Sequence, residues 1–276
     1  MSKTPTNSKL TFSEHLDELR KALTKITCAV IVFMVIIFCF KEDVFRFLLG
    51  PCESDFTTFR ILRKLLSLIR KDVLLYPGNI ELITTDISSQ FMAHLAVSFY
   101  LGIMIASPYI LYELMRYVTP ALYEKEKKYA YKILLAIYLL FFLGMIVSYW
   151  VLFPISCRFL ASYSVSPNVK ALISLDSYMS LFISLTILMG VVFQLPVLAL
   201  SFAKMGIIDN KFMSRYRRHA FILIVVIAAI ITPPDILTLI IVALPLYFLY
   251  EVSIIGVKLL CRREAKSYKK HCRDGY

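Results

Sequence analysis

The feature that most constrains this chain is a series of long apolar stretches. Six of them lie near residues 24–45, 91–113, 130–154, 177–202, 217–232 and 236–257. A helix needs about 20 apolar residues to cross the roughly 30 Å hydrocarbon core of a bilayer. The chain is 59% hydrophobic and only 18% charged, whereas a soluble domain carries about 25% charged residues. The sequence therefore predicts an all-α polytopic membrane protein with one transmembrane helix for each stretch.

The basic residues predict the orientation of these helices. Of the 31 Lys and Arg residues, 22 lie in the two terminal segments and in the loops near residues 113–132 and 203–219. The positive-inside rule then places both termini in the cytoplasm. The net charge of +12 follows this juxtamembrane placement, which favours lipid contact over nucleic-acid binding. The first apolar run, residues 24–40, lacks a small-residue cleavage site after it and reads as an uncleaved anchor.

The last two apolar stretches are predicted to form a hairpin. Thr232 is followed by Pro233, Pro234 and Asp235, and consecutive prolines interrupt a helix and extend the residue before them. We expect a tight turn on the outer side. The arm before it, residues 220–231, would be about 18 Å long at 1.5 Å per residue. The fifth and sixth helices are therefore expected to be short, with a thinned bilayer beside them.

Residues 1–260 are expected to form one membrane domain, followed by a basic cytoplasmic tail at 261–276. The long outer loop at 46–90 contains an amphipathic pattern near 59–75, with basic residues on one face and Leu and Ile on the other. This helix either lies on the outer leaflet or covers the outer face of the bundle. The residues alone favour neither.

No motif of enzymatic chemistry is present in the sequence. Phosphate-binding loops, the nucleophile elbow and the HExxH zinc motif are all missing. The four histidines are far apart, and the six cysteines show no metal-binding spacing. We therefore expect a protein that is not an enzyme and has neither cofactor nor metal. Cys52 and Cys157 both fall in outer segments, where they either pair as a disulfide or remain free thiols.

Polar residues near the spans are the candidates for function, because polar groups are costly in hydrocarbon. Gln194 lies deep in the fourth span, two residues before Pro196. It either makes a functional contact or satisfies the backbone acceptor that the proline leaves without a donor. Glu124 and Glu126 follow Pro120 in a lysine-rich loop, where acids early in a helix also complement its dipole.

Four motifs, in order along the chain, resemble the TatC family of the twin-arginine (Tat) protein translocase. They are HLDELR at 15–20, TPALYEKE at 119–126, FQLP at 193–196 and TPPD at 232–235. The resemblance covers nearly the whole chain. Tyr117 stands where the family usually has Phe, Gln194 where it usually has Glu, and Gln90 where it often has Pro. The outer loop also looks longer than usual by about one amphipathic helix.

The resemblance implies a receptor that binds twin-arginine signal peptides of folded precursors at its cytoplasmic face. Guanidinium groups pair bidentately with carboxylates. Glu18 and Glu126 match acidic positions of the family's motifs, so the resemblance makes them the expected signal-binding acids, while Glu124 is expected to act only at the helix end. Further signal-binding residues implied by the motifs are Arg20, Tyr117, Pro120 and Leu122. Arg20 either orients Glu18 or contacts lipid phosphate.

The resemblance also implies partners and a compartment. It places the chain in a bacterial cytoplasmic (inner) membrane, as a homo-oligomer within a larger complex. Single-span TatA-type and TatB-type subunits would be recruited with the proton-motive force, and Gln194 and Pro196 would contact a partner helix. Pro233, Pro234 and Asp235 would form the outer turn.

Two other functions are compatible with the residues. A secondary transporter or channel for a small solute would use Gln194, His94 and Glu251 to line its path. A scaffold for other membrane proteins would bind partners irrespective of a twin-arginine motif. The scarcity of acids near the bilayer midplane counts against the transporter.

Overall fold

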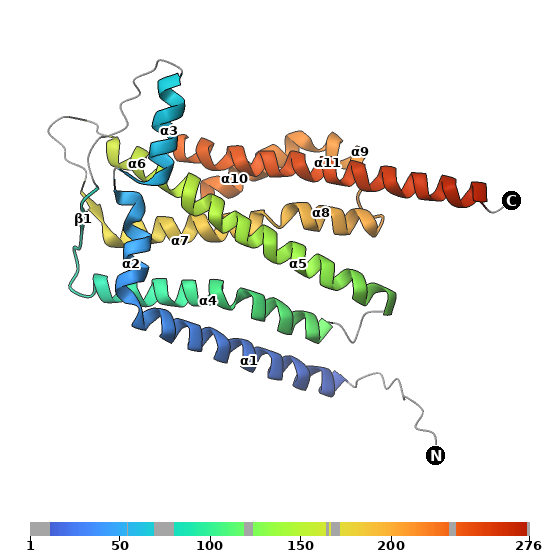
Figure 1. The fold of residues 1–276 in the computed structure, drawn as a ribbon, viewed down its shortest axis with the longest axis horizontal. Helices are drawn as coiled ribbons and strands as arrows, with labels where there is room; N and C mark the ends of the chain where they lie inside the picture. The colour runs from blue at the N-terminus through green and yellow to red at the C-terminus, as the bar shows by residue number, and fades with distance from the viewer. Residues whose placement is uncertain are drawn as a thin grey trace. The chain divides into compact units, whose positions relative to one another are not determined.

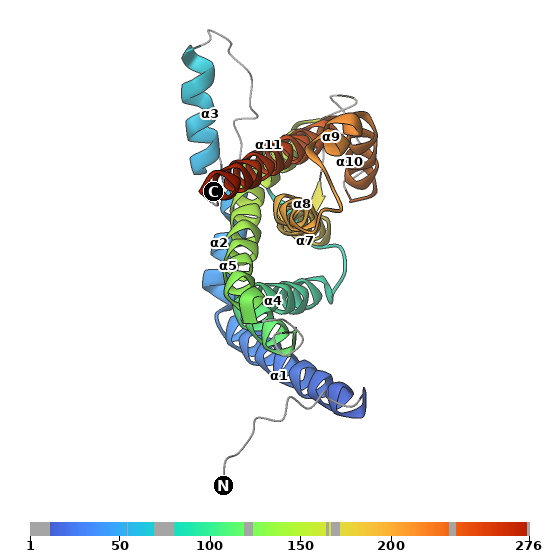
Figure 2. The same ribbon diagram turned by 90° about the vertical axis from the view of Figure 1, so that its right-hand side faces the viewer.

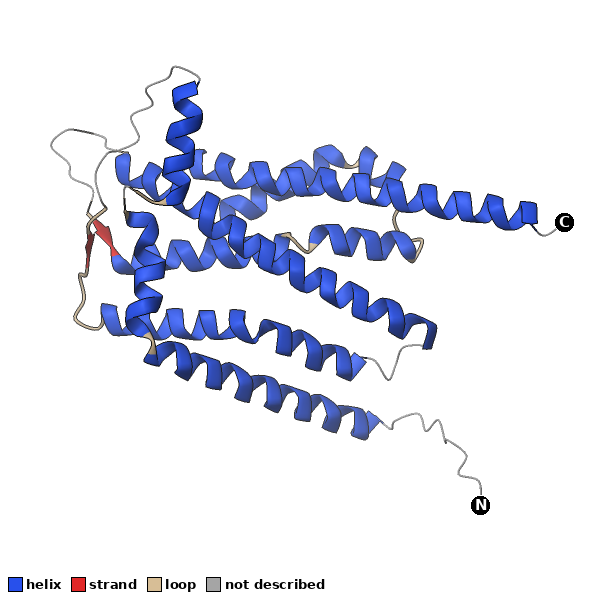
Figure 3. Ribbon diagram, in the orientation of Figure 1, coloured by secondary structure: helices blue, strands red, loops and turns tan. Residues whose placement is uncertain are grey.

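Within the residues that the structure describes, helices form nearly all of the regular structure, and the remainder is one very short pair of strands (Figures 1 and 3). The computed structural model describes residues 12–53, 55–68, 80–118, 124–163, 166, 172–231 and 236–274. Within these residues, five apolar helical segments are long enough to cross a membrane. They are Leu16–Cys39, Ser89–Tyr117, Ile133–Ser162, Leu175–Lys204 and Thr238–Leu260.

Two of these five segments are built from more than one element. Helices α1 (Phe12–Cys39) and α4 (Ser89–Val118) provide the first two. The third runs from α5 (Glu124–Val147) through a π-helical turn, η3 (Ser148–Leu152), into α6 (Phe153–Ser162). The fourth consists of α7 (Leu175–Val192) and α8 (Leu195–Lys204).

The last two helices differ in length. After the short helix α9 (Asn210–Arg215), α10 (Arg217–Ile231) has only 15 residues, about 22 Å of helix. It is the short fifth span that the sequence predicts. The sixth was expected to be short as well, but α11 (Ile236–Asp274) runs as one helix through the basic tail, and its apolar part, Thr238–Leu260, has 23 residues. Pro233, Pro234 and Asp235 lie outside the described residues.

The first span ends earlier than the sequence pattern suggests. Helix α1 stops at Cys39, a turn follows at Phe40, and a separate helix, α2 (Lys41–Leu49), begins. Three consecutive charged residues, Lys41, Glu42 and Asp43, open α2, and these charges belong outside the hydrocarbon. The predicted span at 24–45 is therefore too long at its C-terminal end.

Two compact units make up the chain: Met1–Lys41 with His94–Tyr138, and Glu42–Ala93 with Leu139–Tyr276. In the first unit, α1 and α4 lie side by side in both views (Figures 1 and 2). A Cβ on Gly102 of α4 would lie 3.0 Å from the backbone nitrogen of Met34, so the glycine permits this close approach. Phe38 also stacks on His94, with ring centroids 4.0 Å apart.

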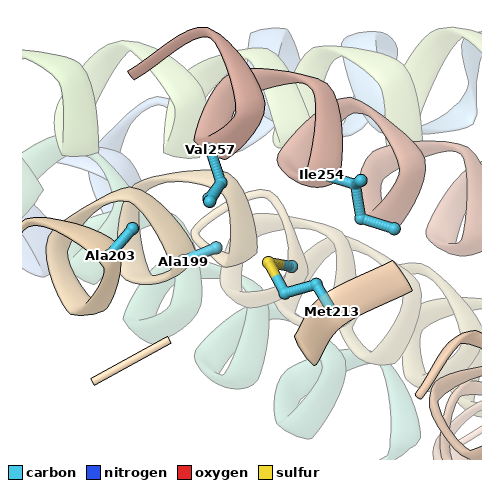
Figure 4. Close-up of a cluster of buried hydrophobic side chains, with 5 residues drawn as sticks. All are labelled: Ala199, Ala203, Met213, Ile254 and Val257. Carbon is cyan, nitrogen blue, oxygen red and sulfur yellow. The ribbon is translucent and has the colours of Figure 1, made fainter. Parts of the chain in front are cut away.

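In the second unit, α8 and α11 pack along one another. Ala199 and Ala203 of α8, Ile254 and Val257 of α11, and Met213 of α9 form a buried cluster (Figure 4). Two of these five side chains are alanines, which allow the helices to approach closely. This packing holds α11 to the rest of the unit by its apolar half.

In the second unit, hydrogen bonds join the end of α2 to η3 and α7. Tyr149 Oη donates to the carbonyl of Phe47 at 2.6 Å, and Tyr178 Oη donates to the carbonyl of Leu48 at 2.8 Å. These carbonyls belong to the last turn of α2, where no intrahelical donor remains. Beyond α2 lies a 3₁₀ turn, η1 (Gly50–Cys52). Strand β1 (Leu82–Ile83) pairs in parallel with β2 (Ile173–Ser174), with Leu82 opposite Ile173.

The loop after η1 contains a helix, α3 (Thr57–Leu68), in the region where the sequence predicts one at 59–75; residues 69–79 lie outside the described residues. Its first turn packs on the bundle. Phe59 is 2% exposed beneath the guanidinium of Arg158, which lies 4.4 Å from the ring centroid. Thr58 Oγ1 donates a hydrogen bond to the carbonyl oxygen of Trp150. Pro154, four residues after Trp150, cannot donate to that carbonyl because proline has no N–H. The start of α3 therefore covers the bundle rather than lying apart from it.

Candidate functional site

The candidate site is a pocket of about 310 Å³ between α1 and α4 of the first unit. It lies where HLDELR, in the first turns of α1, meets the end of α4 at Val118. Thr119 precedes Pro120, and a residue before proline is biased away from helical geometry. The pocket is lined by Glu18, Lys21, Ala22, Lys25, Glu113, Arg116 and Tyr117.

Glu113 is the most buried charged residue of the pocket. It is 4% exposed, and Lys25 Nζ lies 3.3 Å from its Oε1. Tyr109 Oη also donates to Oε1, at 3.2 Å. A buried carboxylate is stable only when it is paired and hydrogen-bonded. This ion pair links the middle of α1 to the C-terminal part of α4.

The pocket contains both signs of charge. Glu18 and Glu113 supply two carboxylates, while Lys21, Lys25 and Arg116 supply three cations. The side chain of Glu18 is partly exposed, so it can be reached from solution. The three cations of the chain therefore outnumber the two carboxylates in this pocket.

The expected signal-binding residues fall into three groups. Glu18 and Tyr117 both line the pocket, although HLDELR and Tyr117 lie far apart in the sequence. Arg20 is exposed and lines a neighbouring hollow with Asp17 and Thr24; the pocket that contains Glu18 does not include it. Glu126 lies in the first turn of α5, and its side chain is outside the described part of the chain, as are Pro120 and Leu122 entirely.

The sequence pattern missed the role of Lys25, Lys21 and Arg116 in this pocket. Glu113 was recognisable as a carboxylate near a span end, but its partner lies 88 positions away. A charge within the apolar pattern of a span signals such a pair. Only the packing of α1 on α4 identifies the cation.

Gln194 lies at the break between α7 and α8, and Pro196 is buried in the first turn of α8. Gln194 Nε2 donates to the carbonyl of Gly190 at 3.3 Å. The acceptor is therefore Gly190, and not Val192, whose carbonyl would face the missing N–H of Pro196. Part of the capacity of Gln194 for hydrogen bonding is used within its own helix.

The residues proposed for a solute path each have a local partner. His94 stacks on Phe38. Glu251 Oε2 lies 3.0 Å from Arg217 Nη2, and Tyr247 Oη donates to Glu251 Oε1 at 3.1 Å. These contacts explain the polar groups as structural links between neighbouring helices, without a solute path.

The sulfur atoms of Cys52 and Cys157 are not joined. Both are free thiols, and both are buried. Of the two states that the sequence allows for this pair, the structure shows the reduced one.

Comparison with known proteins identifies the family. The model of the family "Sec-independent protein translocase protein (TatC)" matches residues 14–245. TatCy of Bacillus subtilis is 33% identical over 260 residues, which are 94% of this chain and 93% of that protein. TatC of Blattabacterium is 32% identical over 251 residues, 90% of this chain and 94% of that one.

Solved structures agree with this result. A crystal structure described as the twin arginine translocase receptor TatC superposes with a TM-score of 0.68 and 32% sequence identity, covering 89% of this chain and 98% of that one. These similarities confirm the all-helical polytopic fold, in which the short α10 is a transmembrane helix in addition to the five long spans. They also confirm a transport role instead of an enzymatic one. The chain belongs to the TatC family of Sec-independent protein translocase proteins.

Proposed function

We propose that this protein is the receptor subunit of a twin-arginine translocase and binds signal peptides in the pocket between α1 and α4. The observation that carries the proposal is that one pocket brings together Glu18, from HLDELR, and Tyr117, from the segment leading into TPALYEKE. The two motif segments lie far apart from each other in the sequence. Their meeting in a pocket of mixed charge supports a binding role for both.

The chemistry of the pocket suits arginine better than lysine. A guanidinium group donates two parallel hydrogen bonds to one carboxylate, whereas an ammonium group acts as a compact point charge. At a membrane surface the lower local dielectric strengthens such pairs. Glu18 and Glu126 are the proposed acids for two adjacent arginines, with Arg20, Pro120 and Leu122 shaping the surroundings. The leucines on the exposed side of α1, Leu16 and Leu23, would contact an apolar segment that follows the arginines.

The proposed orientation places both termini, and hence the pocket, in the cytoplasm of a bacterium. The basic residues of the N-terminal segment and of the tail support this through the positive-inside rule. The membrane would be the cytoplasmic (inner) membrane, since the relatives named above are bacterial.

Single-span TatA-type and TatB-type subunits are the proposed partners for export driven by the proton-motive force, within a complex that contains several copies of this chain. Gln194 and Pro196, at the break between α7 and α8, would contact a partner helix. Unchanged crosslinking of a TatA-type helix to a Gln194→Ala variant would remove this part of the proposal. Thinning of the bilayer beside the short helix α10 would lower the cost of moving folded cargo.

The test is equilibrium binding of a twin-arginine signal peptide and its twin-lysine counterpart to the detergent-purified protein. Wild type should bind the arginine peptide more tightly. Glu18→Ala and Glu126→Ala should each lose most of that preference. Asp17→Ala and Glu124→Ala are matched controls, because each removes the same charge one or two positions away and should leave the preference intact.

Equal binding of both peptides to wild type would refute the receptor proposal. Small-solute flux in liposomes that contain this chain alone would then favour the transporter instead. Partner binding that ignores the twin-arginine motif would favour the scaffold.

A further inference from the structure

Lys25 and Glu113 form an ion pair inside the candidate pocket, and the two side chains differ in exposure. The side chain of Glu113 is 6% exposed, while that of Lys25 is 46% exposed. The carboxylate is therefore held in place by the fold, whereas the ammonium group lies at the pocket's open side. Lys25 can therefore exchange its contact with Glu113 for solvent while the carboxylate stays buried.

The known contacts of Glu113 occupy one carboxylate oxygen. Lys25 Nζ and Tyr109 Oη both meet Oε1. A guanidinium group binds a carboxylate through two parallel N–H donors and uses both oxygens. Lysine therefore satisfies the buried charge with a geometry that an arginine side chain improves.

We propose that Lys25 is an internal competitor for the signal peptide: it neutralises Glu113 in the empty receptor, and an arginine of the signal displaces it. This inference rests on the proposed receptor function and adds Glu113 as a further carboxylate of the site. No covalent bond changes. One cation leaves Glu113 as another arrives, so the buried carboxylate is never left without a partner.

The exchange provides selectivity for arginine. When a twin-lysine peptide displaces Lys25, one ammonium–carboxylate pair replaces another of the same kind, so the exchange adds no binding free energy. When an arginine displaces Lys25, a bidentate pair replaces a monodentate one, and guanidinium is also the more weakly hydrated cation. The internal lysine thus cancels the attraction of any lysine in the ligand and leaves only the difference between the two groups.

The test is a charge-conserving substitution, Lys25→Arg, in the full-length protein in detergent. An internal arginine should hold Glu113 as well as the arginine of the peptide does. We expect the twin-arginine peptide to bind about three- to tenfold more weakly, while binding of the twin-lysine peptide does not change. Lys21→Arg is the matched comparison, because Lys21 lines the same pocket whereas Lys25 pairs with Glu113; it should weaken binding of the twin-arginine peptide less than Lys25→Arg does.

Replacing Lys25 with a neutral residue should change peptide affinity in the opposite direction. Lys25→Met removes the competitor and should tighten binding of both peptides more than Lys21→Met does, since both changes remove one positive charge from the pocket. In a Glu113→Gln background, Lys25→Arg should have no effect. Thermal unfolding of each variant shows whether it is folded.

The two hypotheses fail differently. If wild type does not distinguish the peptides, the receptor function itself is refuted, and this inference with it. If wild type prefers arginine but Lys25→Arg binds the twin-arginine peptide as tightly as Lys21→Arg does, the receptor function stands and displacement of Lys25 is overturned.

Discussion

The side chain of Gln194 donates from Nε2 to the carbonyl oxygen of Gly190, 3.3 Å away and four residues earlier. In an unbroken helix the backbone N–H of Gln194 would donate to that carbonyl. That N–H donates to the carbonyl of Val191 instead, because the chain turns between α7 and α8. The side chain thus replaces a backbone hydrogen bond that the break removes.

Replacing Gln194 with Leu should therefore destabilise the protein, by about 0.5–1.5 kcal/mol, the net value of one hydrogen bond. Thermal unfolding in detergent measures the change. Gln90→Leu is a matched control at an exposed position, and its melting temperature should equal that of wild type. Equal stability of Gln194→Leu and wild type would show that this hydrogen bond contributes nothing.

Gly144 of α5 lies in close contact with the backbone of α7 at Met189. A Cβ at this position would lie 2.6 Å from the carbonyl oxygen of Met189, and a backbone atom cannot rotate aside as a side chain can. We expect Gly144→Ala to force α5 away from α7 and to lower stability by about 1–3 kcal/mol, as overpacking does.

Gly256→Ala provides the comparison for this substitution. Its new Cβ would lie 3.5 Å from a side-chain carbon of Leu200, which is ordinary contact, and alanine favours a helix by about 1 kcal/mol over glycine. Its melting temperature should therefore equal or exceed that of wild type. If Gly144→Ala melts as late as Gly256→Ala, the close contact between α5 and α7 is not a constraint.

Much of the fold follows from local pattern in the sequence, because a membrane span needs only length and apolar composition. The same reasoning places the start of α3 and the short α10. It does not place the end of α1 at Cys39, since Phe40 continues the apolar run and only the charges after it interrupt the helix. It also misses the pairing of Leu82 with Ile173, because strands of two residues have no detectable period.

The candidate site was predictable only in part. Glu18 and Tyr117 belong to motifs and could be named from the sequence. Lys25 looked like one of many juxtamembrane cations, and its contact with Glu113 joins positions 88 residues apart. Which of several lysines meets a buried carboxylate depends on the register of α1 against α4, and the close approach at Gly102 sets this register.

The ion pair between Arg217 and Glu251 links the first turn of α10 to α11. Both side chains are partly exposed, so we expect a coupling free energy of only about 0.5–1 kcal/mol. A double-mutant cycle with Arg217→Met and Glu251→Gln measures it. The coupling should weaken as salt is added.

Arg218→Met is the control for this cycle, because the neighbouring Arg218 is exposed and carries the same charge. Paired with Glu251→Gln, it should show no coupling. A coupling for Arg218 as large as that for Arg217 would mean that the cycle reports the general positive field of the loop and not a specific pair.

Cys52 is predicted to be an unreactive thiol in the folded protein. Burial raises the pKa of Cys52 above its ordinary value, and this effect exceeds the lowering by the hydrogen bond with Tyr178 and by the charge of Arg158. The thiolate is the reactive form, and a raised pKa leaves little of it at neutral pH. At neutral pH, iodoacetamide should therefore fail to modify Cys52 until the protein is denatured, as peptide mass spectrometry would show.

A cysteine introduced at the position after Cys52 tests whether burial, and not the place in the chain, makes Cys52 unreactive. Glu53 is exposed, so a Glu53→Cys substitution should be alkylated in the folded protein while Cys52 is not. The reactivity of Cys52 should rise as pH rises, because its raised pKa postpones ionisation to a higher pH than that of the exposed thiol. Rapid alkylation of Cys52 at neutral pH would contradict its burial. A peptide that joins Cys52 to Cys157, found without reductant, would show that the free thiols of the structure become oxidised once the protein is in its membrane.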